Sequence, residues 1–363
     1  AINELPDLQE RIQVGLLTGG KGKAEKKQLQ LGLDGGYFDL IVGTHALIQP
    51  SLAIPRLGLA VIDERHKFGV RQRELLEKKG KHPDLLMMTA TPLPRALVLT
   101  QYGDTSLSVL DEMPPGRGGI TTRWAHGAMK RDEAYRLVAE RLAAGERAFA
   151  VFPLLEESEH MVLRDATREF ERLKKVFPAF SLGLIHGQLK PSEKEASMRA
   201  FATGEIALLV STSVVEVGID VPDATLMLVE HADRFGLAQL HQLRGRVGRG
   251  PKPSWCVLVT TGNVTPEAQE RLKALVATSD GFALAERDLA LRGPGELFGV
   301  RQHGDAEWEH VDLIADAAEL EAARKEAEAL FASDAKLTST DGARARRALA
   351  TRLSRDWALV VAS

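Results

Sequence analysis

The amino-acid sequence predicts an α/β protein with two lobes built on parallel sheets, followed by a mainly helical tail. Up to about residue 260, short apolar, β-branched runs alternate with amphipathic segments of helical length, a pattern typical of α/β units around a parallel sheet. Residues 111–119 contain two prolines and three glycines, which continue neither a helix nor a strand and therefore predict a boundary between the lobes. From residue 266 onward, strand signals stop, and Ala, Glu, Leu and Arg recur at helical spacing.

The elements of the first lobe follow from these patterns in chain order. Its predicted strands are short apolar runs bounded by glycine or polar residues, at residues 12–17, 40–43, 59–63 and 85–88. A helix is predicted at residues 68–78, where Phe, Val and Leu recur between charged residues.

The second lobe repeats the alternation, and the tail does not. Strands are predicted at residues 148–152, 182–185, 208–211, 226–230 and 256–260. Helices are predicted between them at residues 132–143, 165–176 and 191–202, the last with a proline at its first position. In the tail, helical spacing is clearest at residues 317–331 and 343–353.

Composition limits the classes of protein that the sequence can be. Lys and Arg total 47 against 50 for Asp and Glu, so the net charge of −3 excludes a globally basic nucleic-acid binder but not local basic surfaces. The single cysteine, Cys256, excludes an internal disulfide framework and a multi-cysteine zinc site, and its apolar neighbours predict a buried core thiol. No apolar run approaches the roughly 18 to 20 residues of a membrane span, so we expect a cytoplasmic protein without membrane contact.

Two carboxylates stand where a predicted apolar strand ends. The run V-I-D-E-R-H at residues 61–66 places Asp63 and Glu64 at this point, and open α/β sheets bind their ligands outside the carboxyl ends of the strands. In nucleotide hydrolases an aspartate in such a place holds Mg²⁺, and an adjacent acid polarises the attacking water. The alternative is an acidic first turn of a helix.

Two further runs add to this signal. T-A-T-P at residues 89–92 follows the next predicted strand, where hydroxyls can contact phosphate or can simply cap a helix. Q-L-R-G-R-V-G-R-G at residues 242–250 sets arginines among glycines with no acid nearby. Such arginines usually face an anion, and guanidinium groups delivered to a γ-phosphate form an arginine finger. The alternative is a solvated surface loop.

These runs, in this order, resemble the motifs of superfamily 2 helicases. D-E-R-H, T-A-T-P, the run at residues 212–222 and the arginine run resemble motifs II, III, V and VI, and G-T-H-A-L-I at residues 43–48 resembles a DNA-backbone motif of the first lobe. Residues 287–304, R-D-L-A-L-R-G-P-G-E-L-F-G-V-R-Q-H-G, resemble the translocation motif shared by the RecG family and transcription-repair coupling factors. Over essentially the whole chain the sequence is similar to the RecG family.

The resemblance implies a fold and a division of the chain. It implies two RecA-like helicase lobes, the first incomplete, and a helical translocation tail. We expect the C-terminal part of the first lobe at residues 1–113, the second lobe at residues 114–265 and the RecG-type tail at residues 266–363.

The resemblance also implies roles for residues at the nucleotide. Asp63 would hold Mg²⁺, and Glu64 would activate water. Arg246 and Arg249 would reach the γ-phosphate as catalytic groups. The remaining nucleotide-binding positions would be Gly218, Asp220 and Gln242.

Other positions would couple the nucleotide to DNA or contact the DNA. His66, Thr89 and Thr91 would couple the nucleotide site to the DNA site. The alternative for His66 is an ordinary structural histidine. Hydroxyl and backbone groups suit contacts with phosphates, because such contacts fix register without reading sequence. The implied DNA-binding and translocation residues are Thr44, His45, Thr212, Ser213, Arg271, Arg292 and Gln302.

The sequence departs from the family in three places. A phosphate-binding loop is approached only at residues 15–22, where Gly22 replaces the Ser or Thr that would bind Mg²⁺; this run is either a degenerate loop or a turn that carries exposed lysines near DNA. Nothing resembles the family's N-terminal wedge domain. Arg65 stands where glutamine is usual, and it either pairs with a neighbouring acid or points to solvent.

The implied function is an ATP- and Mg²⁺-dependent motor on branched double-stranded DNA, acting as a monomer, with a single-stranded-DNA-binding protein as a candidate partner. Because the phosphate-binding loop is missing, we expect this chain alone to be deficient in ATP hydrolysis and to expose apolar surface on its first sheet. The alternatives are a non-catalytic DNA-binding fragment and the motor portion of a transcription-repair coupling factor.

Overall fold

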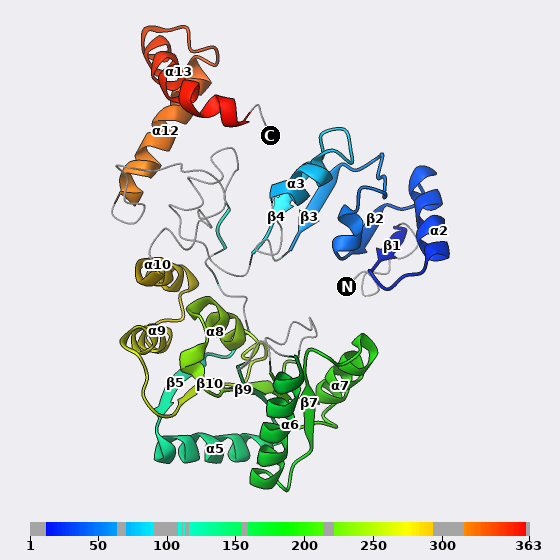
Figure 1. Ribbon diagram of the computed structural model, residues 1–363, viewed down its shortest axis with the longest axis vertical. Helices are drawn as coiled ribbons and strands as arrows, with labels where there is room; N and C mark the ends of the chain where they lie inside the picture. The colour runs from blue at the N-terminus through cyan, green and yellow to red at the C-terminus, as the bar shows by residue number, and fades with distance from the viewer. Residues whose placement is uncertain are drawn as a thin grey trace. The chain divides into compact units, whose positions relative to one another are not determined.

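A computed structural model of the chain describes residues 12–63, 70–89, 108–110, 112, 116–153, 159–212, 221–292 and 316–360. Its internal contacts divide the chain into an N-terminal unit, residues 1–90, and a C-terminal unit, residues 91–363. Figure 1 shows both units and labels most of their helices and strands.

The N-terminal unit contains two pairs of parallel strands. β1 (Val14–Leu17) pairs with β2 (Leu40–Gly43), and β3 (Leu59–Ile62) pairs with β4 (Asp84–Met87). The helical elements of this unit are α2 (Lys23–Asp34), the short 3-10 helix η2 (His45–Ile48) and α3 (Val70–Glu77). All four strands lie within two residues of their predicted bounds.

Small apolar clusters hold this unit together. Leu29 and Leu33 of α2 pack against Leu17 of β1, and Ile48 of η2 packs against Ile62 of β3 and Leu76 of α3. The Lys79 ammonium donates to the Gln49 carbonyl at 2.8 Å, and its burial lowers the pKa of that group. The other side of the strands is exposed and apolar, as expected; it comprises Val14, Leu16, Leu40, Val42, Leu59, Val61, Leu86 and Met88.

The C-terminal unit is built on a six-stranded parallel sheet in the order β5-β10-β9-β6-β8-β7. Its strands are β5 (Ile120–His126), β6 (Arg147–Val151), β7 (Leu182–Ile185), β8 (Leu208–Ser211), β9 (Ala224–Val229) and β10 (Ser254–Thr260). The helices are α5 (Ala128–Ala143), α6 (Glu159–Val176), α7 (Pro191–Thr203), η4 (Ala232–Arg234), α8 (Leu237–Arg244), α9 (Pro266–Ala277), α10 (Gly281–Arg292), α12 (Ala317–Ser333) and α13 (Thr340–Val360).

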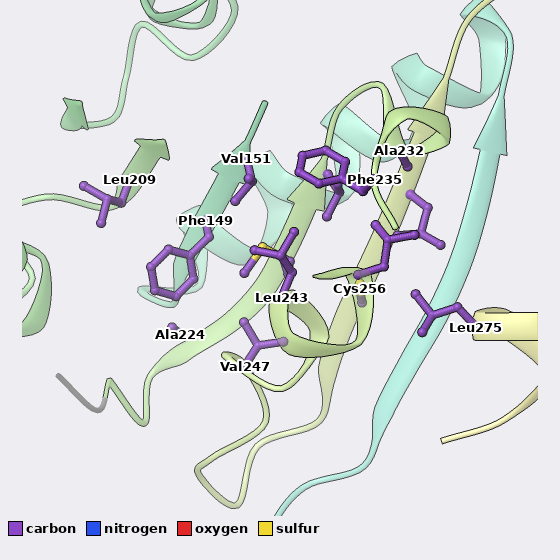
Figure 2. Packing of buried hydrophobic residues seen from close by; sticks show 14 of the residues in the cluster. Phe149, Val151, Leu209, Ala224, Ala232, Phe235, Leu243, Val247, Cys256 and Leu275 are labelled. Carbon is purple, nitrogen blue, oxygen red and sulfur yellow. The ribbon is translucent and has the colours of Figure 1, made fainter. Parts of the chain in front are cut away.

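Helices cover both faces of this sheet. Val138 of α5 and Leu173 of α6 pack against one face, where alternate residues such as Ala148 and Ala150 of β6 meet them. On the opposite face, α7, α8, α9 and α10 enclose a second cluster that includes Phe149 and Leu243, and Figure 2 shows Leu243, Cys256 and Leu275 in this cluster. A parallel sheet buried on both faces explains why these strands are continuously apolar.

The structure confirms the predicted α/β class. Elements that were not predicted include α2, α8 and β5, and α6 begins six residues before its predicted start. Residues 120–126 were not predicted as a strand, because Thr121, Thr122 and Arg123 interrupt the apolar pattern. β5 ends the strand order and, among the described strands, pairs only with β10. Most of its side chains are partly or fully exposed, so polar residues are tolerated there. The buried thiol predicted at Cys256 is confirmed, and burial raises its pKa to about 12.

Both predicted tail helices are present as α12 and α13, and each extends beyond its predicted bounds. No helix in the described part of the chain has the length and apolar content needed to cross a membrane.

Candidate functional site

In the N-terminal unit, the candidate residues stand at the carboxyl ends of strands. Asp63 directly follows β3, and Thr89 lies two residues beyond β4. Ile62 and Met87 are partners in the strand register, and the Met88 amide donates to the Ile62 carbonyl at 2.8 Å. The structure therefore brings Asp63 and Thr89 to neighbouring strand ends, both with exposed side chains. Glu64, Arg65, His66 and Thr91 lie outside the described residues.

Thr44 and His45 follow the carboxyl end of β2 directly. Both are exposed, and Thr44 begins η2 without a hydrogen bond from its side chain to the helix. The preceding residue must be glycine, because a Cβ at Gly43 would lie 2.2 Å from the Leu17 carbonyl oxygen of β1. This close approach fixes the point at which Thr44 leaves the sheet.

The glycine- and lysine-rich run between β1 and α2 forms a turn. The Lys21 amide donates to the Thr18 carbonyl at 3.3 Å, and α2 begins at Lys23 with the Gly22 amide bound to the Glu25 carboxylate at 3.0 Å. Both interpretations of this run require a turn between β1 and α2, and the structure has one, with Lys23 exposed at the start of α2.

In the C-terminal unit, two polar side chains lie directly after β7 and β8, the half-buried His186 and the buried Thr212. Ile185 and Ser211 are register partners, so the residues that follow them, His186 and Thr212, are neighbours. Thr212 is 3% exposed, and neither its Oγ1 nor Nδ1 of His186 has a hydrogen-bond partner among the residues that the structure describes. Burial, and then the charge of Lys194, lower the pKa of His186. Both atoms therefore keep hydrogen-bonding capacity that no described residue uses.

His186 was not among the residues assigned a role from sequence. The signal that could have found it is its place directly after a predicted strand, in the run H-G-Q-L-K-P. Three other predicted residues near this edge, Ser213, Gly218 and Asp220, lie outside the described residues.

The arginine loop, which we define as residues 245–250, follows α8. Leu240 and Leu243 of α8 are fully buried, and Val247 is 1% exposed, so the core holds the backbone on either side of the loop. Gly248 has φ of 71°, and a Cβ there would lie 2.6 Å from Ile120 of β5. The structure therefore fixes the loop tightly against the sheet.

Three candidate nucleotide-binding residues lie on or beside this loop. The side chains of Gln242, Arg246 and Arg249 are half-buried, and Nε of Arg249 donates to the Gly245 carbonyl at 3.3 Å. Gln242 lies in α8, and Arg246 and Arg249 lie in the arginine loop that follows it.

Arg244, in the same run, does not face an anion. It is 5% exposed and donates to the carbonyl oxygens of Leu275 at 2.9 Å and Thr278 at 2.7 Å. The expectation that arginines of this run face an anion is therefore wrong for Arg244, because the end of α8 lies against the carbonyl groups at the end of α9.

Arg271 on α9 also points into the protein. Its Nη2 donates to the Asp233 carbonyl of η4 at 3.0 Å, and its Nε is buried without a partner in the described part of the chain. Arg292 is the last residue of α10, and nothing is described of its side chain. Gln302 lies outside the described residues.

Comparison with protein families gives two matches in the C-terminal unit. Residues 150–251 match the helicase conserved C-terminal domain. Residues 278–359 match the C-terminal part of domain 3 of ATP-dependent DNA helicase RecG.

Known proteins are similar over a longer stretch. The Thermotoga maritima protein named ATP-dependent DNA helicase RecG is 50% identical over 87% of this chain and 40% of its own length. The protein of that name from Escherichia coli K12 is 47% identical over 85% of this chain and 45% of its own length. A solved structure of RecG bound to a three-way DNA junction matches with a TM-score of 0.65 and 42% identity, covering 88% of this chain and 41% of that one. The chain spans less than half the length of these relatives.

The parallel sheet, the polar residues at its strand ends and the match at residues 150–251 place the chain in the class of helicases with RecA-like lobes. Within that class, the chain belongs to the RecG family of ATP-dependent DNA helicases.

Proposed function

We propose that the protein works as the motor of an ATP-dependent helicase that remodels branched double-stranded DNA, such as stalled forks and Holliday junctions. The observation that carries the proposal is the similarity to RecG proteins over more than four fifths of the chain, including a structure of RecG on a three-way junction. We further propose that residues 1–113 belong to the first helicase lobe, residues 114–265 form the second, and residues 266–363 form the translocation tail.

For the nucleotide site, the proposal assigns the chemistry to a small set of residues. Mg²⁺ is usually held by one or two carboxylates together with substrate phosphates, and the exposed Asp63 at the end of β3 fits this requirement. When bound, Mg-ATP supplies the phosphoryl group and the metal charge that neutralises it.

Asp63 would hold the metal, and Glu64 would orient the attacking water. Arg246 and Arg249 would stabilise negative charge on the γ-phosphate, supported by Gln242, Gly218 and Asp220. A guanidinium group suits this task because it donates several hydrogen bonds in a plane and keeps its charge.

For DNA, the proposal uses groups that bind phosphates without reading bases. Thr44 and His45 on the N-terminal unit and Thr212 and Ser213 on the C-terminal unit would contact the backbone. His186 joins this set because it follows β7 beside Thr212, and its Nδ1 lacks a hydrogen-bond partner among the described residues. His66, Thr89 and Thr91 would relay the state of the nucleotide, while Arg271, Arg292 and Gln302 would act in translocation.

Partners and assembly belong to the proposal as well. The similar RecG structure was solved with a three-way DNA junction bound to that protein, which supports branched DNA as the substrate here. We propose that the motor acts as a monomer in the cytoplasm, and that a single-stranded-DNA-binding protein is a further partner.

The test is DNA-stimulated ATP hydrolysis in two forms of the protein. One is the chain itself. The other is a chimera in which residues 1–363 replace the matching part of the Thermotoga maritima relative. We expect the chimera to hydrolyse ATP when a three-way junction is added, and the chain alone to bind Mg-ATP weakly or not at all in calorimetry. Micromolar affinity in the chain alone would contradict the second expectation.

Variants of the chimera test the residues. Arg249→Ala and Glu64→Gln should each lower kcat by about a hundredfold or more, because each removes a group that acts on the developing charge or on the attacking water. Arg199→Ala is the matched control, since Arg199 is exposed and pairs only with the exposed Glu195 among the described contacts. Unchanged kcat in the two test variants would refute their roles. A chimera that binds junctions without any hydrolysis would favour a non-catalytic DNA-binding protein.

A further inference from the structure

Lys79 is a half-buried cation of the N-terminal unit that the proposed chemistry does not use. It lies two residues beyond the end of α3. Its ammonium donates to the Gln49 carbonyl oxygen at 2.8 Å and also to the carbonyl oxygen of Leu52. The Leu52 amide in turn donates to the Gln49 carbonyl at 3.1 Å. Lys79 therefore holds both ends of one turn that lies almost thirty residues earlier in the chain.

This turn belongs to the connecting segment, which we define as residues 49–58, between η2 and β3. The segment is also held from α2. Nε2 of Gln30 donates to the Ala53 carbonyl, and Oε1 of Gln30 accepts from the Ala53 amide, each at 3.1 Å. A Cβ at Gly80 would lie 2.5 Å from the Leu57 carbonyl oxygen, so the chain beyond α3 lies directly against the segment. The connecting segment is therefore fixed from α2 on one part and from the end of α3 on another.

The connecting segment follows the residues to which the proposed function gives contacts with DNA. Thr44 and His45 stand at the start of η2, and Ile48 at its end packs against Ile62 of β3 and Leu76 of α3. Thr44 makes no capping hydrogen bond from its side chain to η2. A helix of four residues has little stability of its own. Contacts outside η2 therefore decide where its first residues lie.

We infer that Lys79 is a positioning residue for the DNA contacts of the N-terminal unit. By holding the turn that follows η2, it fixes η2 and, with it, Thr44 and His45 at the end of β2. The inference rests on the proposed function for the task of Thr44 and His45, while the hold itself rests on the contacts of Lys79. An ammonium group suits this hold, because it has three donors and no acceptor and so can bind two carbonyl oxygens at once. Lys79 contacts neither nucleotide nor DNA in this assignment.

The hold is tested first on the chain itself, by amide hydrogen exchange. Lys79→Met keeps much of the length and the apolar part of the side chain but removes all three donors. The amides of Leu47 and Leu52 donate to the carbonyls of Thr44 and Gln49, so they report η2 and the turn after it. We expect both to exchange about tenfold faster in Lys79→Met than in the unsubstituted chain.

Two further variants make this measurement decisive. Lys78→Met is the matched control, because Lys78 is the neighbouring lysine and is exposed, and it should change nothing. Lys79→Arg restores the charge and the donors and should bring exchange back to within about threefold. If Lys79→Met unfolds the N-terminal unit, seen as a loss of helix in far-ultraviolet circular dichroism, Lys79→Gln, which keeps an amide donor, decides in its place. Unchanged exchange at Leu47 and Leu52 overturns the hold.

The effect on DNA is tested in the chimera, by the concentration of three-way junction that half-saturates the stimulation of ATP hydrolysis. With Lys79→Met we expect this concentration to rise about tenfold, while kcat at saturating junction stays within about twofold. Lys79→Arg should restore the original value. In a chimera that already carries Thr44→Val and His45→Ala, Lys79→Met should add less than about twofold, because the contacts that Lys79 positions are already lost.

The outcomes separate this inference from the proposed function. A merely structural role would lower kcat and leave the half-saturating concentration unchanged, and that result overturns the inference. A full tenfold effect of Lys79→Met on top of Thr44→Val and His45→Ala also overturns it, because Lys79 would then act through other residues. If the junction does not stimulate the unsubstituted chimera, the proposed function fails, and hydrogen exchange decides the hold alone.

Discussion

The sheets of the two units are made of similar sequences but are covered differently. In the C-terminal unit, every residue of β9 is at most 1% exposed. In the N-terminal unit, Leu59 and Val61 of β3 are 57% and 54% exposed, although β3 is just as apolar. Helices lie on both faces of the six-stranded sheet, whereas the described helices of the N-terminal unit leave one side of its strands open. An apolar run therefore forms a strand in both units, but only the helices around it decide whether it becomes core.

The acidic residues at strand ends also differ in burial between the two units. At the end of β9, Glu230 is buried between Arg131 and Tyr135 of α5 and Arg172 of α6, with Arg131 Nη2 at 3.2 Å and Arg172 Nη2 at 3.8 Å. At the end of β3, Asp63 is exposed. The C-terminal unit thus uses an acid at a strand end to join two helices to its sheet, and the N-terminal unit leaves one accessible to a ligand.

The largest expected effect contrasts a core residue with an exposed one. Phe201 of α7 is fully buried, and its ring centroid lies 4.7 Å from that of Phe149. Phe201→Ala should lower the free energy of unfolding of the C-terminal unit by about 3 to 5 kcal/mol, because a cavity replaces the ring. Leu86→Ala, at a side chain 51% exposed on the N-terminal unit, should change the stability of its own unit by less than about 1 kcal/mol.

Urea denaturation checks this contrast. All four tryptophans of the chain lie in residues 91–363, so their fluorescence reports the C-terminal unit, and far-ultraviolet circular dichroism adds the N-terminal unit. A loss for Leu86→Ala as large as that for Phe201→Ala would show that the open side of the N-terminal strands is covered in solution.

A second, smaller effect is expected at the buried acid of the C-terminal unit. Glu230→Gln keeps the shape of the side chain but leaves Arg131 and Arg172 without a buried anion. We expect a loss of about 2 kcal/mol, below the range for fully buried pairs because both arginines reach solvent. Glu133→Gln, at an exposed pair with Lys130 on the same helix, is the control and should leave the denaturation midpoint unchanged. Equal midpoints for both variants would show that Glu230 does not join α5 and α6 to the sheet.

The smallest expected effect is a pH dependence at His241. Burial, and then the charge of Arg244, lower its pKa to about 4. The unfolded chain binds a proton near the ordinary value of about 6.5 and the folded chain does not, so stability is full above that pH and falls as the pH drops toward 4. Because the ring is not fully buried, we expect a loss on the order of 1 kcal/mol from this group. His241→Asn should reduce the dependence between pH 6.5 and 4; the same slope in both proteins would contradict the assignment.

Most of the fold could be predicted from the sequence, for physical reasons that particular strands make clear. β2, β7 and β8 have their predicted bounds because each is a short apolar run with a clear polar or glycine end. β5 could not be found in this way, because an edge strand needs apolar residues only where it meets the core. The exposure of the N-terminal strands was expected because the phosphate-binding loop is missing. No residue within the strands themselves predicts it.

For the candidate site too, sequence spacing predicts where residues lie in the chain but not their long-range contacts. Spacing alone placed Asp63 and Thr89 at strand ends, because parallel strands end at one edge. Arg244 could not be separated from Arg246 and Arg249 by sequence, since the three arginines alternate with glycine and valine within six residues. What distinguishes Arg244 is a long-range contact with α9, about thirty residues away.

The pairing of β5 with β10 has a consequence for the order in which the C-terminal unit can be built during synthesis. Ile120 is the register partner of Ser254, and the Gly118 amide donates to the Gly250 carbonyl at 2.8 Å. The first strand of the sheet in sequence therefore finds its neighbour only when the last one has left the ribosome. Until then β5 lacks the strand that it pairs with in the sheet. The six-stranded sheet therefore cannot be completed before residues 254–260 have been synthesised.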